Sequence, residues 1–161
     1  MFYIPKHFPP QEFFPKKLIE QYSTPKGVKD LIWTLMDSRL LWTADQLRIE
    51  FGSMVINDYL YGGKNQYRGY RPAIELIDTK KFKETGEIIP LFSSFTSQHC
   101  NGRALDGSFK NILAQDVVKY IIKHPTKDIF KFITGIEKEV NWLHVDTRNF
   151  IPTTENRFYL F

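Results

Sequence analysis

The segment from Ser97 to Asp106 constrains this chain most, because a histidine and an aspartate enclose small residues at alternate positions. Successive side chains of a β-strand point to opposite faces, so a strand from Gly102 would place Gly102, Ala104 and Asp106 on one face. Open space would then remain above the aspartate, and His99 could reach it from the preceding loop. Neutral imidazole and carboxylate are both ligands that zinc accepts in proteins.

A second histidine segment lies far downstream, at Trp142–Asp146. Its alternation predicts a half-buried strand that carries Trp142, His144 and Asp146 on one face and two aliphatic residues on the other. A catalytic zinc needs three protein ligands and an open position for water. His144 is therefore the candidate third ligand, beside His99 and Asp106.

The two segments read S-x-H-x-x-G-x-A-x-D and W-x-H-x-D. In this order they resemble the zinc D-Ala-D-Ala carboxypeptidases and murein endopeptidases, a family with a hedgehog-like zinc fold that includes many phage-encoded cell-wall hydrolases. The resemblance covers most of the chain. It implies Zn²⁺ as cofactor and His99, Asp106 and His144 as its ligands.

A third segment, Arg68-Gly69-Tyr70-Arg71, extends the resemblance. The family carries S-G-Y-R here, with the arginine in the active site, whereas this chain has Arg68 in place of the serine and an apparent insertion before it. The resemblance implies that Arg71 holds a carboxylate or carbonyl of the substrate, a task that suits a fixed cationic fork.

A zinc peptidase also needs a general base, usually a carboxylate, to activate water. Several relatives place an acid three residues before the last zinc histidine, but here that residue is Asn141. Glu139 and Glu137 lie slightly further upstream, and either is a candidate, with Glu139 placed first because it is nearer to His144 in sequence. Both could equally be solvated turn residues.

Four further residues are expected to orient a metal ligand or to contact substrate: Ser97, Asp146, Trp142 and Tyr70. Asp146 is too close to His144 along a strand to share its metal easily, so we expect it to accept a hydrogen bond that orients a ligand. The single cysteine, Cys100, excludes an internal disulfide and is expected to be a free thiol near the site.

The length of 161 residues predicts a single zinc peptidase-like domain, 1–161, and the 16% aromatic content argues against disorder. Prolines interrupt residues 1–26, which are expected to form an irregular arm. Residues 147–161 form an aromatic tail that should pack on the domain or on a partner. Residues 73–96 are expected to form a loop wall around the cleft.

The predicted fold is α+β, with about three helices packed on one face of a small, mainly antiparallel sheet that bears the zinc site. Apolar spacing and capping signals predict the helices, with Thr43 opening a capping box and Gly52 ending that helix. The elements are helices from about Gly27 to Ser38, Ala44 to Phe51 and Leu113 to His124, with strands at Met54–Asn57 and Ile129–Ile136, the latter forming a hairpin with the His144 strand.

The net charge of +4 comes from scattered lysines and arginines, which indicates a solvated basic surface rather than a nucleic-acid interface. No signal peptide and no apolar run long enough to span a membrane are evident. A wall-degrading enzyme of this kind is expected in a phage virion, or in the host cytoplasm before lysis.

Two functions follow as expectations. The first is a zinc-dependent peptidase that cleaves cross-links or stem peptides of bacterial peptidoglycan. The alternative is a catalytically inactive virion or structural protein that retains the fold and contacts other virion proteins through its aromatic termini. A third possibility, an α+β domain without metal, would require both histidine motifs to be coincidental.

Overall fold

A mixed, mostly antiparallel sheet of five strands forms the centre of the computed structural model, which describes residues 2–23, 29–72 and 97–161. The strand order is β1-β2-β4-β3-β5, and only the β3–β5 pair is parallel. The strands are β1 (Met54–Val55), β2 (Ala104–Phe109), β3 (Gly135–Ile136), β4 (Leu143–Asp146) and β5 (Tyr159–Leu160).

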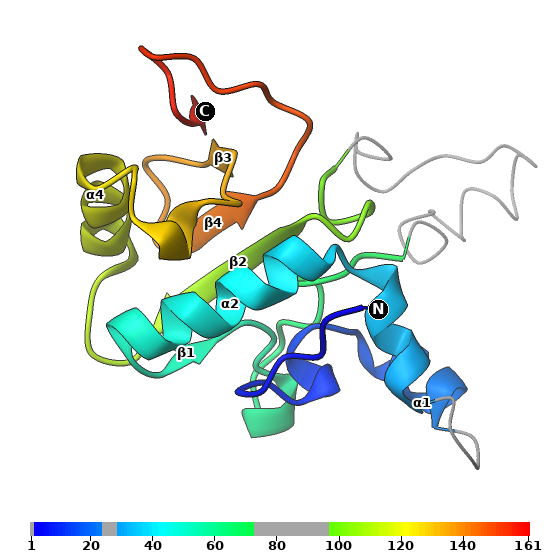
Figure 1. The fold of residues 1–161 in the computed structure, drawn as a ribbon. Helices are drawn as coiled ribbons and strands as arrows, with labels where there is room; N and C mark the ends of the chain where they lie inside the picture. The colour runs from blue at the N-terminus through cyan, green and yellow to red at the C-terminus, as the bar shows by residue number, and fades with distance from the viewer. Residues whose placement is uncertain (1, 24–28, 73–96) are drawn as a thin grey trace, which may run out of the picture.

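Three α-helices accompany this sheet in the described ranges: α1 (Lys16–Tyr22), α2 (Ser38–Phe51) and α4 (Ala114–Lys123). Figure 1 shows α2 lying across β1 and β2, with α4 beside β4. Apolar residues of α2 and α4 join Leu105, Leu143 and Val145 in one buried cluster, so both helices cover the same sheet face. The predicted α+β class is confirmed, and the opposite face of β2 and β4 is left for the polar residues.

Helix α2 is longer than predicted and begins elsewhere. Its N-cap is Asp37, whose carboxylate accepts a hydrogen bond from the Arg39 backbone N–H. The predicted capping box at Thr43 is wrong, because the Thr43 hydroxyl lies inside the helix and donates to the Arg39 carbonyl. The helix ends before Gly52, as predicted, where a φ of 88° favours glycine.

The predicted helix from Gly27 to Ser38 is replaced, where it is described, by a 3₁₀ helix over Lys29–Leu35. The N-terminal arm also departs from the prediction, since its second half forms α1 directly after Pro15. Proline suits this start because it lacks the N–H that a first turn leaves unpaired. The aromatic rings of Phe13 and Phe14 are buried edge-on against Trp33, which fixes the arm to the domain.

The strand predicted over Ile129–Ile136 is wrong for most of its length. Asp128–Phe130 is a 3₁₀ helix, and only Gly135–Ile136 joins the sheet. Phe130 and Ile133 are both fully buried at a spacing of three, which is a helical rather than an alternating pattern. The predicted pairing with the His144 strand is confirmed, because β3 and β4 are antiparallel neighbours.

The C-terminal tail packs on the domain, as one of the two expected alternatives. Strand β5 pairs with β3, and Phe158 is only 7% exposed. In the described part of the chain, no helix has the length and apolarity needed to cross a membrane. The predicted loop wall at 73–96 lies outside the described residues.

Candidate metal centre

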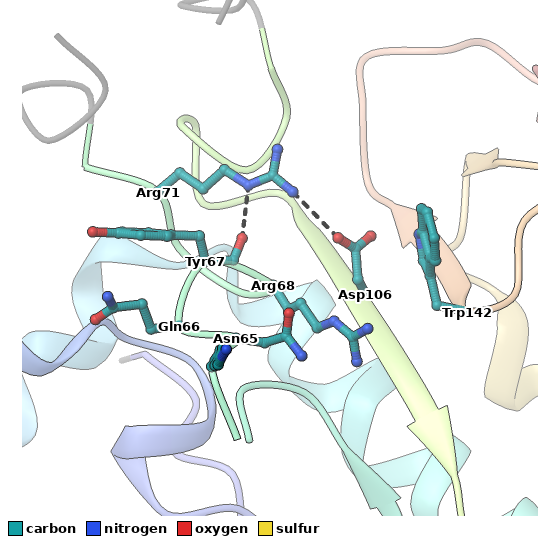
Figure 2. Close-up of a pocket in the computed structure, with 8 residues that line it drawn as sticks. Asn65, Gln66, Tyr67, Arg68, Arg71, Asp106 and Trp142 are labelled. Atoms are coloured by element: carbon teal, nitrogen blue, oxygen red, sulfur yellow. Dashed lines mark hydrogen bonds and ion pairs between the residues drawn. The ribbon is translucent and has the colours of Figure 1, made fainter. Parts of the chain in front are cut away.

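A cavity of about 350 Å³ opens beside the polar face of β2, at the edge formed by the 64–71 segment (Figure 2). Its lining includes Arg71, Asp106 and Trp142. Arg71 reaches across this cavity, and its Nη2 donates a hydrogen bond to Oδ2 of Asp106 at 3.2 Å. The Nε of the same guanidinium donates to the Tyr67 carbonyl at 2.6 Å, which fixes the direction of the side chain.

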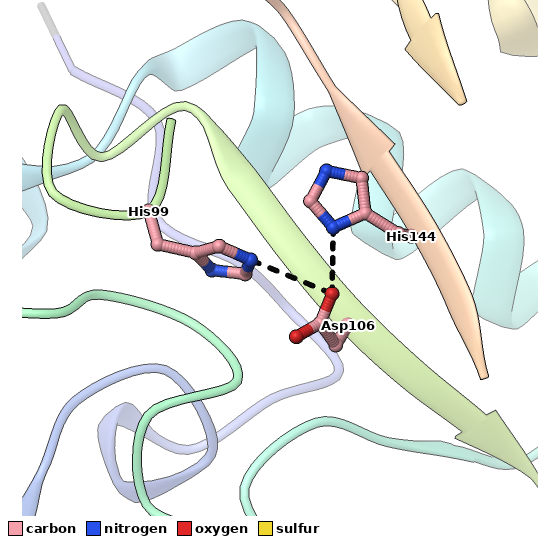
Figure 3. A group of neighbouring side chains, drawn as sticks. All are labelled: His99, Asp106 and His144. Carbon is pink, nitrogen blue, oxygen red and sulfur yellow. Dashed lines mark hydrogen bonds and ion pairs between the residues drawn. The ribbon is translucent and has the colours of Figure 1, made fainter. Parts of the chain in front are cut away.

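Three predicted ligands converge next to this cavity (Figure 3). The antiparallel register sets Asp106 of β2 directly opposite His144 of β4, and His99 approaches from the turn before β2. All three side chains are buried, and each offers a ligand atom within 4.8 Å of the other two. These residues could hold a metal ion.

The sheet register explains why the two motifs meet. Ala104 lies opposite Asp146, so one face presents Ala104, Asp106, His144 and Asp146 together. The predicted parity of Ala104 and Asp106 is confirmed. Gly102 lies outside the strand, in a turn with a φ of 65°, where a Cβ would lie 2.0 Å from the Leu35 carbonyl oxygen. That glycine therefore allows close packing of the turn that carries His99, rather than opening the sheet face.

One oxygen of Asp106 is shared between the histidines. Its Oδ1 lies 2.7 Å from Nδ1 of His144 and 3.4 Å from Nε2 of His99. Burial alone would raise the pKa of Asp106, but the hydrogen bond with His144 and the close approach of the His99 ring hold it well below its ordinary value. Burial alone would lower the pKa of His144, but the hydrogen bond with Asp106 and the nearby carboxylate of Asp146 raise it to about 9. Asp106 is thus a buried carboxylate held between two histidine rings.

A backbone carbonyl orients His99. The Nδ1 atom lies 2.8 Å from the oxygen of Gly69, which can only accept, so Nδ1 carries the proton in the neutral ring. Nε2 is then the His99 atom that faces Asp106, at 3.4 Å, and the atom that could bind a metal ion. The Ser97 hydroxyl accepts a hydrogen bond from the His99 backbone N–H at 3.3 Å. Ser97 therefore holds the loop that carries His99.

A carboxylate orients His144. The Nε2 atom of His144 is buried and makes no hydrogen bond that meets normal geometry with any described residue, yet Oδ2 of Asp146 lies 3.4 Å away. Asp146 is itself completely buried and is held by the backbone N–H and the guanidinium of Arg148. A carboxylate behind a metal-ligating histidine is the usual device that fixes its ring.

The structure separates the two candidate bases. Oε2 of Glu137 lies 3.8 Å from Nδ1 of His144, the same atom that faces Asp106. Glu139 is exposed and has a left-handed φ of 63°. Both glutamates border a pocket beside Gln115 and Lys119 of α4, but among the described contacts only Glu137 also lies near His144. Proximity in sequence favoured Glu139, but the turn between the strands brings Glu137 to the site instead.

The remaining predicted residues lie in two environments. Trp142 borders the cavity as expected of a substrate contact. Tyr70 packs instead against Phe14, with ring centroids 6.1 Å apart, and burial raises the pKa of its hydroxyl. Cys100 forms no disulfide, and burial raises the pKa of its thiol, which makes it a poorer metal ligand than a thiolate.

Sequence reasoning missed three groups that support the ligands: the Gly69 carbonyl, Arg148 and Phe161. The ring of Phe161 meets the His144 ring edge-on at 5.5 Å, and the Arg148 guanidinium lies over Phe161 at 4.4 Å. No local pattern signals a backbone carbonyl as a hydrogen-bond partner, and the tail reaches His144 only through the pairing of β5 with β3.

Known proteins were compared with this chain at the level of family, sequence and structure. No protein family model, curated protein or solved structure matches the chain.

Proposed function

We propose that this protein is a zinc-dependent peptidase that acts on the peptides of bacterial peptidoglycan. The observation that carries the proposal is the convergence of His99, Asp106 and His144, with a carboxylate, Glu137, at 3.8 Å from a ligand nitrogen. The substrate class comes from the motif resemblance, as does the assignment to a phage, in its virion or in the host before lysis.

The donor set fits zinc. Two imidazole nitrogens and one carboxylate oxygen make a three-ligand site, which leaves a fourth position open. Both histidines have partners that fix their rings, and the buried Nε2 of His144 gains its bond to Asp146 once Nδ1 is committed to a metal. Ligand atoms around a tetrahedral zinc lie about 3.4 Å apart. The 2.7 Å separation of His144 and Asp106 would therefore widen slightly on binding.

Zinc at this site would supply a Lewis acid that polarises the scissile carbonyl and lowers the pKa of water. Glu137 would take the proton from the attacking water at Oε2 and return it to the leaving amine. Its half-buried position beside the ligands suits that role. Arg71 would donate to the carbonyl oxygen as negative charge develops, since its Nη1 makes no hydrogen bond to another described residue.

A metal titration coupled to hydrolysis tests the proposal. The protein is stripped with a chelator, reloaded with zinc, and incubated with purified sacculi of several wall types while released amines are measured. We expect binding of one zinc ion per chain and release of amines only by the loaded protein. Stoichiometric zinc without release on any wall type would reject the peptidase and favour the inactive virion protein. Absence of zinc binding would also reject the peptidase, and it would leave an inactive structural protein that keeps the fold without the metal.

A further inference from the structure

We propose that Arg68 and Lys64 form a subsite that binds a carboxylate of the substrate peptide, beside the metal centre. This inference rests on the proposed peptidase function for the identity of its ligand. It starts from the residue at which the chain departs from the family motif, where arginine replaces serine.

The described lining of the cavity beside Asp106 is mostly basic. It includes Lys64, Arg68 and Arg71 but, among the described residues, only one carboxylate, Asp106, which is already paired with Arg71 and both histidines. Arg68 donates to a neutral partner, the Ser108 hydroxyl at 3.0 Å. Neither Arg68 nor Lys64 forms an ion pair with a described residue, so two positive charges border this cavity with no anionic partner in the described part of the chain.

The backbone that carries Arg68 is fixed on several sides. Its N–H donates to the side-chain oxygen of Asn57 at 2.9 Å, and its carbonyl accepts from the Asp106 N–H at 2.7 Å. Two residues later, the Tyr70 N–H donates to the Phe13 carbonyl at 2.7 Å. Because the chain is held in this way, little conformational entropy would be lost when Arg68 binds an anion.

The hydrogen bond of Arg68 with Ser108 indicates how far the Arg68 guanidinium lies from the candidate metal site. Ser108 follows Asp106 by two positions on the same face of β2, which corresponds to about 7 Å along the strand. An extended peptide covers that distance in about two residues. Figure 2 shows Arg68 and Trp142 on either side of Asp106, so an apolar wall faces the cationic one. The cavity thus suits a short peptide with small apolar side chains and a carboxylate about two residues from the cleaved bond.

Two sources could supply that carboxylate: the C-terminus of the peptide, as in a carboxypeptidase substrate, or an acidic side chain, as in an endopeptidase substrate. The probes are acetyl-Lys-D-Ala-D-Ala with a free carboxylate, the same peptide as its C-terminal amide, and an amidated peptide with an internal glutamate. Their equilibrium dissociation constants are measured with zinc-loaded and metal-free protein.

We expect Arg68→Gln to weaken binding of a carboxylate probe by about 10-fold to 100-fold, the factor for one charge-assisted hydrogen bond. Binding of the C-terminal amide probe, which has no carboxylate, should not change. Lys64→Gln should cause a smaller loss and, because Lys64 is exposed, leaves the fold intact. The control is Lys110→Gln, which removes the same charge at an exposed position outside this cavity.

Equal affinity of the unmodified protein for the acid and amide probes would overturn the subsite, as would unchanged acid binding in both variants. Preference for the terminal acid assigns a carboxypeptidase substrate, and preference for the glutamate probe an endopeptidase substrate. Carboxylate-dependent binding by a protein that hydrolyses nothing would keep the subsite while rejecting the peptidase.

Discussion

The Nδ1 atom of His99 lies 2.8 Å from the backbone oxygen of Gly69. The next residues of the same segment donate backbone N–H groups to the carbonyls of Phe13 and His99, at 2.7 and 3.3 Å. The 68–71 segment therefore does two things at once. It delivers Arg71 to Asp106, and it sets the orientation of a candidate metal ligand.

Replacing Gly69 should disturb metal binding without touching a ligand. A Cβ at this position would lie 2.3 Å from the Phe13 carbonyl oxygen, so Gly69→Ala requires a backbone shift here, and we expect it to displace the Gly69 carbonyl from His99. We expect metal affinity to fall by about 10-fold to 100-fold, the usual cost of losing a group that orients a ligand. Competition with a chromogenic chelator measures the change.

The matched control is Gly52→Ala, at the end of α2. A Cβ there meets nothing within 4 Å, but the φ of 88° makes alanine strained. This variant should lose about 1 kcal/mol of unfolding free energy and retain full metal affinity. If both alanine variants bind metal equally well, the Gly69 carbonyl does not orient His99.

Removal of one candidate ligand should abolish stoichiometric metal binding. We expect His144→Ala to lose the ion, whereas Asn141→Ala, three residues away and exposed, keeps it. Metal content after gel filtration distinguishes the two. Equal content in both variants would contradict the assignment of His144.

Much of the fold and site could be predicted because both depend on alternation along two strands. The parity of Ala104 with Asp106, and of His144 with Asp146, is visible in the sequence, and it is sufficient to place those residues on one sheet face. The end of α2 at Gly52 could also be predicted from local sequence, because it needs only a positive φ, which glycine tolerates.

The errors occurred where tertiary contacts determine local structure. Asp37 caps α2 while it also accepts from the distant Thr147 hydroxyl, so the start of this helix depends on both ends of the chain. The positions of Glu137 and Glu139 depend on a turn with one left-handed residue, which strand counting cannot follow. Sequence distance from His144 was therefore a poor guide to distance in space.

Asp146 provides a test of the support behind His144. Asp146→Asn keeps the shape of the side chain but weakens its bonds with Arg148 and its interaction with Nε2 of His144. We expect metal affinity to fall by about 10-fold to 100-fold and unfolding free energy to fall by about 1–3 kcal/mol. Denaturant unfolding and chelator competition measure the two effects separately.

The exposed Asp116, whose ion pair among the described residues is with Lys119 on α4, offers the control. Asp116→Asn should change neither quantity by much, because surface pairs contribute about 0–1 kcal/mol. A loss of stability in Asp146→Asn with no loss of metal affinity would assign Asp146 to the fold alone.

The final prediction concerns the base. Glu137 has its Oε2 3.8 Å from Nδ1 of His144, and its side chain is 31% exposed, so it lies beside a candidate ligand and is also partly open to solvent. Replacing it with glutamine preserves its size and hydrogen bonding but removes the site that accepts a proton. Glu137→Gln should therefore lower turnover by about 10²–10⁴-fold while zinc stays bound.

Glu139→Gln is the matched control, since it makes the same chemical change two residues away, at an exposed position. It should leave turnover on sacculi within about twofold of the unmodified protein, because surface substitutions of this kind seldom perturb a rigid site. Both variants should unfold at the same denaturant concentration as the parent. Full activity in Glu137→Gln would reject this residue as the base, and a large loss in Glu139→Gln alone would mean that the turn rearranges when substrate binds and exchanges the two carboxylates.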